Sequence, residues 1–374
     1  MACLPERDGK RREWMEVALR REGGEEYVHR HRKHTFRPGG DGRVALMHDA
    51  GMKSYSMKSS AEHATIELLE VAMPEPGPRQ LLVKMHAASL NRGEFIVGHG
   101  LQKPGTSKAI GMEGAGEIVE LGPDVTGWST GQRVMGRCAG AFSEYALMDL
   151  REAIAMPPNL SFEEAASIPL TFLVVHDMLV AQGKLAKGEW LLVTGVSSGV
   201  GVASLQAAKA LGARVVGTSG SQEKLDRLKA EGLDQGIRTR AADFHDAVMK
   251  ATEGKGVNLV VNTVGGSVFA ECVRCMAFEG RLATVGYVDG VLKSEIDIQA
   301  LHAKRLTLFG VSNKMRTPEQ RAAGVPAFRA DLMPAFAAGR IRPVVDRVFP
   351  FDQLEEARAY MEANRHLGKI VIAI

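Results

Sequence analysis

Short apolar runs alternate with helical patterns through residues 190–309. Residues 191–193 have the length and composition of a buried strand, and a tight turn of serine and glycine follows them. Apolar positions then recur with helical spacing over residues 202–211, and Gly212 suits the end of a helix. Further apolar runs at 259–262 and 282–285 continue the alternation. This pattern predicts an α/β fold with a doubly wound sheet.

Alternation with a period of two dominates the stretch before it, from about residue 52 to residue 150. The predicted strands are residues 65–71, 80–88, 116–121, 132–136 and 142–148. These runs predict an antiparallel β domain of about a hundred residues.

Mixed patterns mark the junctions of these two parts. Residues 161–164 have the form of a capping box and predict the start of a helix. After residue 333 the pattern becomes mixed again, with a predicted helix at 352–364 and a closing strand at 369–374. The chain order is therefore a β domain, a nucleotide-type domain and a return segment.

Residues 1–50 differ from the rest because their apolar positions are sparse and follow no period. Basic runs such as residues 29–34 can bind nucleic acid, but the composition favours a disordered N-terminal extension. A third alternative is that the true start is Met47 or Met52, with a translated leader upstream. We expect no nucleic-acid partner.

Composition excludes only a few classes of protein. The 374 residues are 45% hydrophobic and 24% charged, as in ordinary globular proteins, and the formal net charge of +3 indicates no particular partner. No apolar run approaches the roughly 18 residues of a membrane span, and no signal pattern begins the chain. We therefore expect a cytoplasmic protein without membrane contact.

Four cysteines are scattered along the chain and do not suggest a disulfide framework. They are Cys3, Cys138, Cys272 and Cys275. The last two form a C-x-x-C inside a predicted helix at 268–278, which favours packing over redox chemistry.

The turn after residues 191–193 indicates a dinucleotide site. A helix N-terminus directs unpaired N–H groups and a partial positive charge toward a pyrophosphate. The predicted binding loop is Ser198, Gly199, Val200 and Gly201, in which the two glycines permit close approach of the backbone. The alternative is a plain strand-to-helix turn.

The next strand, residues 213–217, indicates which dinucleotide is bound. Thr218 and Ser219 stand where NAD-specific sites usually have an acidic residue, and Lys224 follows one turn on. Each charge-assisted hydrogen bond to a 2′-phosphate is worth roughly 1.5–3 kcal/mol. The sequence predicts NADP(H), unless Lys224 is a solvated lysine paired with acidic neighbours.

Later strands end in small or polar residues, where ligands sit in open α/β sheets. Asn262, Gly265, Gly266 and Gly286 are predicted to face the cofactor.

Several motifs resemble the medium-chain dehydrogenase/reductase superfamily, in particular its zinc-free NADPH:quinone oxidoreductase branch. They are Ala-Ala-Ser-Leu-Asn at 87–91, Gly-Met-Glu-Gly-Ala-Gly at 111–116, the loop at 198–201 with Gln206 and Lys209, and Gly-Lys-Ile-Val at 368–371. The resemblance covers residues 52–374. It implies a GroES-like catalytic domain over residues 51–173, completed by 312–374, and a Rossmann NADP-binding domain over 174–311.

The resemblance also implies that zinc is absent. Zinc alcohol dehydrogenases of the superfamily hold catalytic zinc with Cys, His and Cys, and the matching residues here are Asn91, Met112 and Thr171. None is a good zinc ligand. The four-cysteine structural zinc lobe is missing too, so we expect no metal.

Asn91 and Thr171 are the predicted catalytic residues, both as polar contacts for nicotinamide or substrate. The alternative for Asn91 is a turn asparagine, and for Thr171 a buried threonine bonded to a helix carbonyl. Many relatives have a tyrosine lining the cleft where this chain has Gln102, so Gln102 or solvent would serve in its place.

Two basic positions complete the predicted cofactor site. Relatives have a tyrosine near Thr239 that touches the 2′-phosphate, and here Arg240 or Arg238 would take over, unless it is a solvated surface arginine. Lys369 would reach the cofactor side of the cleft, or else be an edge-strand lysine.

The sequence thus predicts an NADPH-dependent, zinc-independent oxidoreductase acting on a small-molecule quinone or enone. An enoyl-thioester reductase and an NADPH-binding protein with little turnover stay open as alternatives. Residues 294–311 match the region through which relatives commonly pair across a two-fold axis, so a homodimer is expected.

Overall fold

The computed structural model describes residues 51–59, 64–95 and 107–374. The expected N-terminal extension, residues 1–50, and Gln102 lie outside the described residues. Within the described part of the chain, no helix combines the length and the apolar character that crossing a membrane requires.

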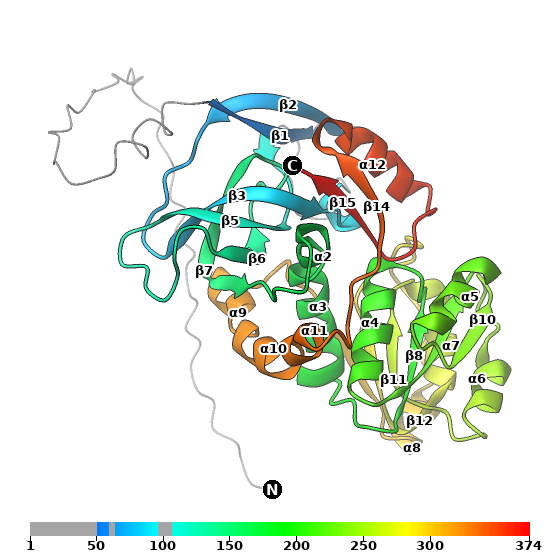
Figure 1. Ribbon diagram of the computed structural model, residues 1–374. Coiled ribbons are helices and arrows are strands. Elements are labelled where there is room, and N and C mark those ends of the chain that lie inside the picture. Colours follow the sequence, from blue (N-terminus) through cyan, green and yellow to red (C-terminus); the bar gives the residue numbers. More distant parts are fainter. Residues whose placement is uncertain (1–50, 60–63, 96–106) are drawn as a thin grey trace, which may run out of the picture. The chain divides into compact units, whose positions relative to one another are not determined.

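A six-stranded sheet follows the strand order β10-β9-β8-β11-β12-β13, and every pairing in it is parallel (Figure 1). Its strands are β8 (Trp190–Thr194), β9 (Arg214–Ser219), β10 (Gln235–Arg238), β11 (Val257–Asn262), β12 (Met276–Thr284) and β13 (Thr307–Gly310). Counted along the chain, this is the order 3-2-1-4-5-6 of a doubly wound dinucleotide-binding sheet. The order reverses between β8 and β11, so the crevice for a ligand lies at their carboxyl ends.

The β8 residues show why this sheet is covered on both faces. Leu191 and Val193 pack into one hydrophobic core and Leu192 into another, and all three are fully buried. A continuous apolar run fits such a strand, since neither face meets water. The connecting helices are α4 (Gly199–Ala210), α5 (Gln222–Ala230), α6 (His245–Ala251), α7 (Phe269–Arg274) and α8 (Ile298–Ala303), with a short turn η3 (Gly266–Val268).

A second six-stranded sheet has the order β14-β15-β3-β5-β6-β7, and β7 also pairs with β3. The strands β3, β5, β6 and β7 therefore close on themselves as a small barrel. Their bounds are β3 (Gln80–Ser89), β5 (Glu113–Leu121), β6 (Arg133–Cys138) and β7 (Tyr145–Ala155). A three-stranded antiparallel sheet lies beside it in the order β2-β1-β4, with β1 (Gly51–Ser59), β2 (Ala64–Ala72) and β4 (Ser107–Ala109). The turn η1 (Arg92–Glu94) follows β3.

The return segment extends the second sheet. Strands β14 (Val345–Pro350) and β15 (Lys369–Ala373) are parallel to each other, and β15 pairs antiparallel with β3. The helix α12 (Leu354–Glu362) and the turn η4 (Phe351–Gln353) lie between them. The pairing of β15 with β3 is what a catalytic domain completed by residues 312–374 requires. The expected domain boundaries at residues 173 and 311 stay a prediction.

Helices connect the two sheets. The capping box expected at 161–164 is present: Ser161 Oγ accepts from Glu164 N, and the Glu164 carboxylate accepts from Ser161 N, at the start of α2 (Phe162–Ala166). Next come α3 (Pro169–His176) and the π-helical turn η2 (Asp177–Ala181). After β13 the chain forms α9 (Pro318–Ala322), α10 (Val325–Asp331) and α11 (Met333–Ala337).

Several expected boundaries are wrong, and two of them show the reason. The helix expected at 268–278 ends at Arg274, because Met276 is the first residue of β12 and pairs with Val257. The strand expected at 142–148 begins only at Tyr145, because residues 142 and 143 bond instead to β1, through Tyr55 N to Phe142 O and a bridge between Ser54 and Ser143. In both cases a partner strand distant in sequence decides the boundary.

Candidate active site

The glycine loop between β8 and α4 is held in a single conformation by its own groups. Ser198 is the N-cap of α4: its Oγ accepts from Gly201 N at 3.1 Å and donates to Gly195 O at 2.9 Å. Gly201 has no room for a side chain, since a Cβ there would lie 2.5 Å from Gly195 O. The loop thus presents the N-terminus of a twelve-residue helix at the crevice between β8 and β11. Ser198, Gly199 and Val200 are half-buried and lie where the sequence predicts the dinucleotide site.

The last two residues of β9 are tied to the glycine loop. Thr218 Oγ1 accepts from Gly195 N at 3.2 Å, and the hydroxyls of Ser219 and Ser197 are 3.2 Å apart. Both Thr218 and Ser219 are buried. Thr218 therefore supports the loop, and the Ser219 hydroxyl is hydrogen-bonded to that of Ser197.

The structure brings Arg240, one of the candidate cations, against the turn that follows β9. A Cβ on Gly220 would lie 2.3 Å from Arg240 Nε, so the exposed Arg240 side chain crosses directly over Gly220. Lys224 instead donates from Nζ to Asn364 O at 2.8 Å and to His366 O at 2.7 Å. Burial lowers the pKa of Lys224. Lys224 is thus neither a freely solvated lysine nor paired with an acidic neighbour, because it ties α5 to the segment before β15.

The loop after β11 is organised by Asn262, which is fully buried. Its Oδ1 accepts from Val264 N and Gly265 N at 3.0 and 3.1 Å, and its Nδ2 donates to Gly265 O at 2.9 Å. Asn262 therefore shapes this loop through its side chain.

Glycines are required where the two later loops meet. Gly265 has φ +132, and a Cβ there would lie 2.1 Å from Asp289 Oδ1. A Cβ on Gly266 would lie 2.6 Å from Val291 O, and one on Gly286 would make an ordinary contact with Thr263 O. The loops that end β11 and β12 thus pack against each other at the carboxyl edge of the sheet.

A buried ion pair lies beside the glycine loop. Lys369 Nζ donates to Glu113 Oε1 at 3.0 Å, to Asn91 Oδ1 at 2.8 Å and to Leu90 O at 3.0 Å. Glu113 has no exposed surface, and the Lys369 side chain is 8% exposed. A Cβ on Gly199 would lie 2.9 Å from Lys369 Cδ, and Gly368 N donates to Ser197 O. Lys369 therefore joins the glycine loop to the barrel strand β5, and it is not an edge-strand lysine in water.

The remaining bonds to Glu113 fix the orientation of Asn91. Ser89 Oγ and Asn91 Nδ2 both donate to Glu113 Oε1, and Leu170 N donates to Glu113 Oε2 at 2.7 Å. Because Lys369 can only donate and Glu113 accepts, the Asn91 amide must direct Oδ1 to the lysine and Nδ2 to the carboxylate. Asn91 is thus held by side chains from other strands and does not cap its own turn.

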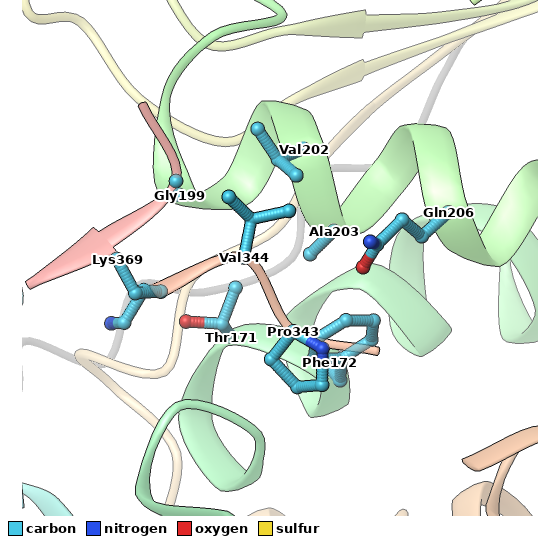
Figure 2. A pocket seen from close by; sticks show the side chains of 10 residues that line it. Thr171, Phe172, Gly199, Val202, Ala203, Gln206, Pro343, Val344 and Lys369 are labelled. Atoms are coloured by element: carbon cyan, nitrogen blue, oxygen red, sulfur yellow. The ribbon is translucent and has the colours of Figure 1, made fainter. Parts of the chain in front are cut away.

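Thr171 lies in the first turn of α3, next to Leu170. It is 3% exposed, and its hydroxyl makes no hydrogen bond within the part of the chain that the structure describes. Figure 2 shows Thr171 and Lys369 on one side of a small cavity, with Gly199 and Val202 of α4 across from them. The cavity measures about 10 Å³, close to the volume that one water needs. Thr171, Asn91 and the glycine loop are therefore brought together around Lys369.

Glu94 is a member of this cluster that the sequence did not predict. It is 4% exposed, and its Oε1 accepts from Asn91 Nδ2 at 2.9 Å. Burial raises the pKa of the Glu94 carboxyl to about 8, and the hydrogen bond from Asn91 opposes this only in part. Glu94 is therefore a neutral carboxylic acid at pH 7.

Glu113 and Ser89 were also missed, although both stand inside the motifs at 87–91 and 111–116. The available signal was a carboxylate at the start of an apolar, glycine-rich strand, a position where burial is costly without a partner. Its partner is 256 residues away, so the pattern alone could not identify it.

The residues at the zinc positions do not suit zinc. Asn91 is committed to Lys369 and two carboxylates, Met112 offers only a thioether, and Thr171 a hydroxyl. The buried carboxylate Glu113 has its charge compensated by an ammonium group. Among the described residues, no three or more His, Cys, Asp or Glu side chains are grouped as a metal site would need.

A dinucleotide-type sheet joined to a barrel, with a polar cluster between them, defines the class of a nucleotide-dependent oxidoreductase. Two family models match the chain: "Alcohol dehydrogenase GroES-like domain" over residues 77–158 and "Zinc-binding dehydrogenase" over residues 199–325. The zinc-type alcohol dehydrogenase-like protein C1773.06c of Schizosaccharomyces pombe is 31% identical over a match of 328 residues, and the match covers 79% of this chain and 91% of that protein. The chain belongs to the medium-chain dehydrogenase/reductase superfamily, as the sequence motifs predicted.

The names of other relatives indicate two different kinds of protein. The quinone oxidoreductase-like protein 2 homolog of Nematostella vectensis is 28% identical over 79% of this chain and 82% of that protein. The highly reducing polyketide synthase ALT1 of Alternaria alternata is 30% identical over 83% of this chain, which spans only 12% of that protein. The mycobacterial protein Rv1454c, solved in complex with NADPH, is 26% identical with a TM-score of 0.75, over 86% of this chain and 100% of that one.

The buried Glu94 gives a testable pH dependence. Its pKa is about 8 in the folded protein and close to the ordinary 4.5 in the unfolded chain, so between these values the unfolded chain has lost a proton that the folded protein keeps. The contribution to the free energy of unfolding is fully present below about pH 4.5 and is lost as pH rises through about 8. Glu94→Gln should remove this dependence, so the variant gains stability relative to wild type as pH rises.

Urea denaturation at a series of pH values measures the difference in free energy of unfolding between wild type and Glu94→Gln. The contributions of other titrating groups cancel in this difference. The exposed Glu67→Gln is the matched control and should show no such trend. A difference between Glu94→Gln and wild type that stays constant from about pH 5 to about pH 8 would contradict the assignment of Glu94 as a neutral acid.

Proposed function

We propose that this chain is an NADPH-dependent, zinc-independent reductase that transfers a hydride to quinones or related α,β-unsaturated carbonyls. The observation that carries the proposal is the junction at Lys369, where the glycine loop meets Asn91 and Thr171 in a place without zinc ligands. Metal-free chemistry suits acceptors whose product oxyanion is delocalised, because they need less electrophilic help than an unactivated ketone.

The chain's own groups would bind and orient the reactants. A bound nicotinamide supplies the hydride. The Thr171 hydroxyl is available as a hydrogen-bond partner, and the Lys369 ammonium places a positive charge beside the N-terminus of α4. Asn91, locked by Glu113 and Lys369, presents one fixed amide orientation.

Cofactor choice is part of the proposal. Arg240 over Gly220, next to Ser219, offers a guanidinium for a 2′-phosphate, and no described carboxylate is bonded to that guanidinium. Gly265, Gly266 and Gly286 lie in the loops after β11 and β12, and these loops would line the nicotinamide half of the cofactor site. The NADPH complex of the mycobacterial relative supports the same choice. Because Lys224 is held by two carbonyl groups, we assign the larger role to Arg240.

An enoyl-thioester reductase is the second candidate, favoured by the similarity to a segment of a highly reducing polyketide synthase. A cytoplasmic location also stays part of the proposal, supported by the free thiols of the buried Cys138, Cys272 and Cys275.

Steady-state oxidation of NADPH tests the function directly. We expect turnover with ortho- or para-quinones that survives treatment with a strong chelator. Faster turnover with crotonyl coenzyme A would favour the second candidate, and no turnover with either substrate would favour a binding role. Elemental analysis showing stoichiometric zinc that is lost together with activity would contradict the zinc-free chemistry.

Arg240→Ala tests the cofactor site. The variant loses the charge-assisted hydrogen bonds to the 2′-phosphate, so the KM for NADPH should rise about tenfold or more, with little change for NADH. Lys255→Ala removes an exposed lysine elsewhere and serves as the matched control. Equal use of NADPH and NADH by the wild type would show that the 2′-phosphate site is wrongly assigned.

We also propose a homodimer built on residues 294–311. Strand β13 ends the order of the nucleotide-type sheet and is bonded there only to β12 among the described strands, and Ile298 is 65% exposed. An edge strand of this kind favours pairing with a second copy.

Light scattering on dilute protein should give twice the chain mass of 40.4 kDa. Ile298→Asp and Leu308→Pro should both shift the protein toward monomer, with circular dichroism confirming that each variant is folded. The exposed Phe278→Asp lies outside this segment and should leave the mass unchanged. A wild-type mass near that of one chain would rule out the stable dimer.

A further inference from the structure

Five charged side chains of alternating sign form a row, four on strands of the second sheet and the last on α9: Lys369, Glu113, Arg137, Glu152 and Arg321. Glu113 and Arg137 are register partners on β5 and β6, and Arg137 faces Glu152 of β7. Directly opposed residues in antiparallel strands point to the same face, so Arg137 shares the face of Glu113 and its neighbour Asn91. This set is called the charge row.

The two ends of the charge row are paired. Lys369 Nζ lies 3.0 Å from Glu113 Oε1, and Arg321 Nε lies 3.6 Å from Glu152 Oε1. Arg137 Nη1 lies farther from the same Glu152 oxygen, at 3.9 Å. The row contains three cations and two carboxylates, and Glu94 beside it is neutral at pH 7. Arg137, in the middle, therefore shares the carboxylate of Glu152 with Arg321, and the row carries one cation more than it has carboxylates.

Arg137 also lacks hydrogen bonds. The residue is 9% exposed, and its Nε is sealed from solvent without a partner, as is Glu152 Oε1. In the part of the chain that the structure describes, no acceptor lies within hydrogen-bond geometry of this guanidinium. Burial lowers the pKa of Arg137 and raises that of Glu152, so this environment disfavours both charges. A buried guanidinium that shares its one counter-charge and makes no hydrogen bond is costly unless another anion completes it.

We propose that Arg137 binds a carboxylate group of the substrate, which makes the enzyme selective for enones that carry an acidic group. This inference rests on the proposed function. A guanidinium binds a carboxylate through two parallel hydrogen bonds, which fix orientation as well as charge. Lys369 is the member of the charge row that lies against the glycine loop, and Arg137 stands one strand beyond Glu113 on the same face of the sheet.

Acetylacrylate and its methyl ester form a matched pair of enones that differ in one negative charge. Arg137→Gln should lower kcat/KM for acetylacrylate roughly ten- to a hundredfold, as expected for loss of charge-assisted hydrogen bonds, and leave the ester nearly unchanged. Arg137→Lys should recover part of the loss. Arg329→Gln, an exposed arginine on α10, is the control with the same change of charge. An equal loss for acid and ester would overturn the inference.

Binding of levulinate, the saturated product acid, separates this inference from the proposed function because it needs no turnover. Calorimetry should show levulinate binding to wild type that is lost in Arg137→Gln, with no binding of methyl levulinate. Binding of levulinate without turnover of any substrate would support the anion site and contradict the proposed reductase function. Turnover of the methyl ester without binding of levulinate would support the reductase function and contradict the anion site.

A second variant guards against a folding defect in Arg137→Gln. Glu152→Gln removes the carboxylate that competes for Arg137, so levulinate should bind several-fold more tightly, a gain that a purely structural role would not produce. Unchanged or weaker binding in a folded Glu152→Gln protein contradicts the inference. A loss in Arg137→Gln seen with crotonyl coenzyme A but not with levulinate would assign the anion to a coenzyme A phosphate and would overturn the carboxylate ligand.

Discussion

The buried bond between Lys369 and Glu113 is the interaction on which the rest of the site depends. It connects the first residue of β15 with the first residue of β5, and the same lysine lies against Gly199. Burying two charges costs about as much as their attraction returns, so this pair is weak evidence for stability. Its effect is geometric: it defines which way the Asn91 amide faces and how the glycine loop meets the barrel.

The local parts of this architecture could be predicted from the sequence. An apolar run, a glycine turn and a helical repeat define β8, the loop and α4, because all three depend on neighbours within a few residues. The capping box at Ser161 is equally local. The division into a parallel sheet and a mainly antiparallel sheet follows from the spacing of the apolar runs.

The partners of the site residues could not be predicted. Lys224 has the right chemistry for binding a phosphate, but it is bonded to the carbonyl groups of residues 364 and 366. No pattern in the sequence near residue 224 indicates these partners. Glu94 becomes a neutral acid only because the fold buries it beside the carboxylate of Glu113. Such features arise from the register between strands that are distant in sequence, and register is decided by the whole sheet.

The separation of Lys369 from Glu113 has a consequence for the order of folding. Strands β3, β5, β6 and β7 are complete by residue 155, but the counter-charge for Glu113 comes from a segment 256 residues further along. Until that segment is synthesised, the Glu113 carboxylate must stay hydrated, and the barrel cannot close over it without a large electrostatic cost. Closing so long a loop is slow in comparison with forming a hairpin. The Lys369–Glu113 pair therefore couples docking of β15 to closure of the barrel over Glu113.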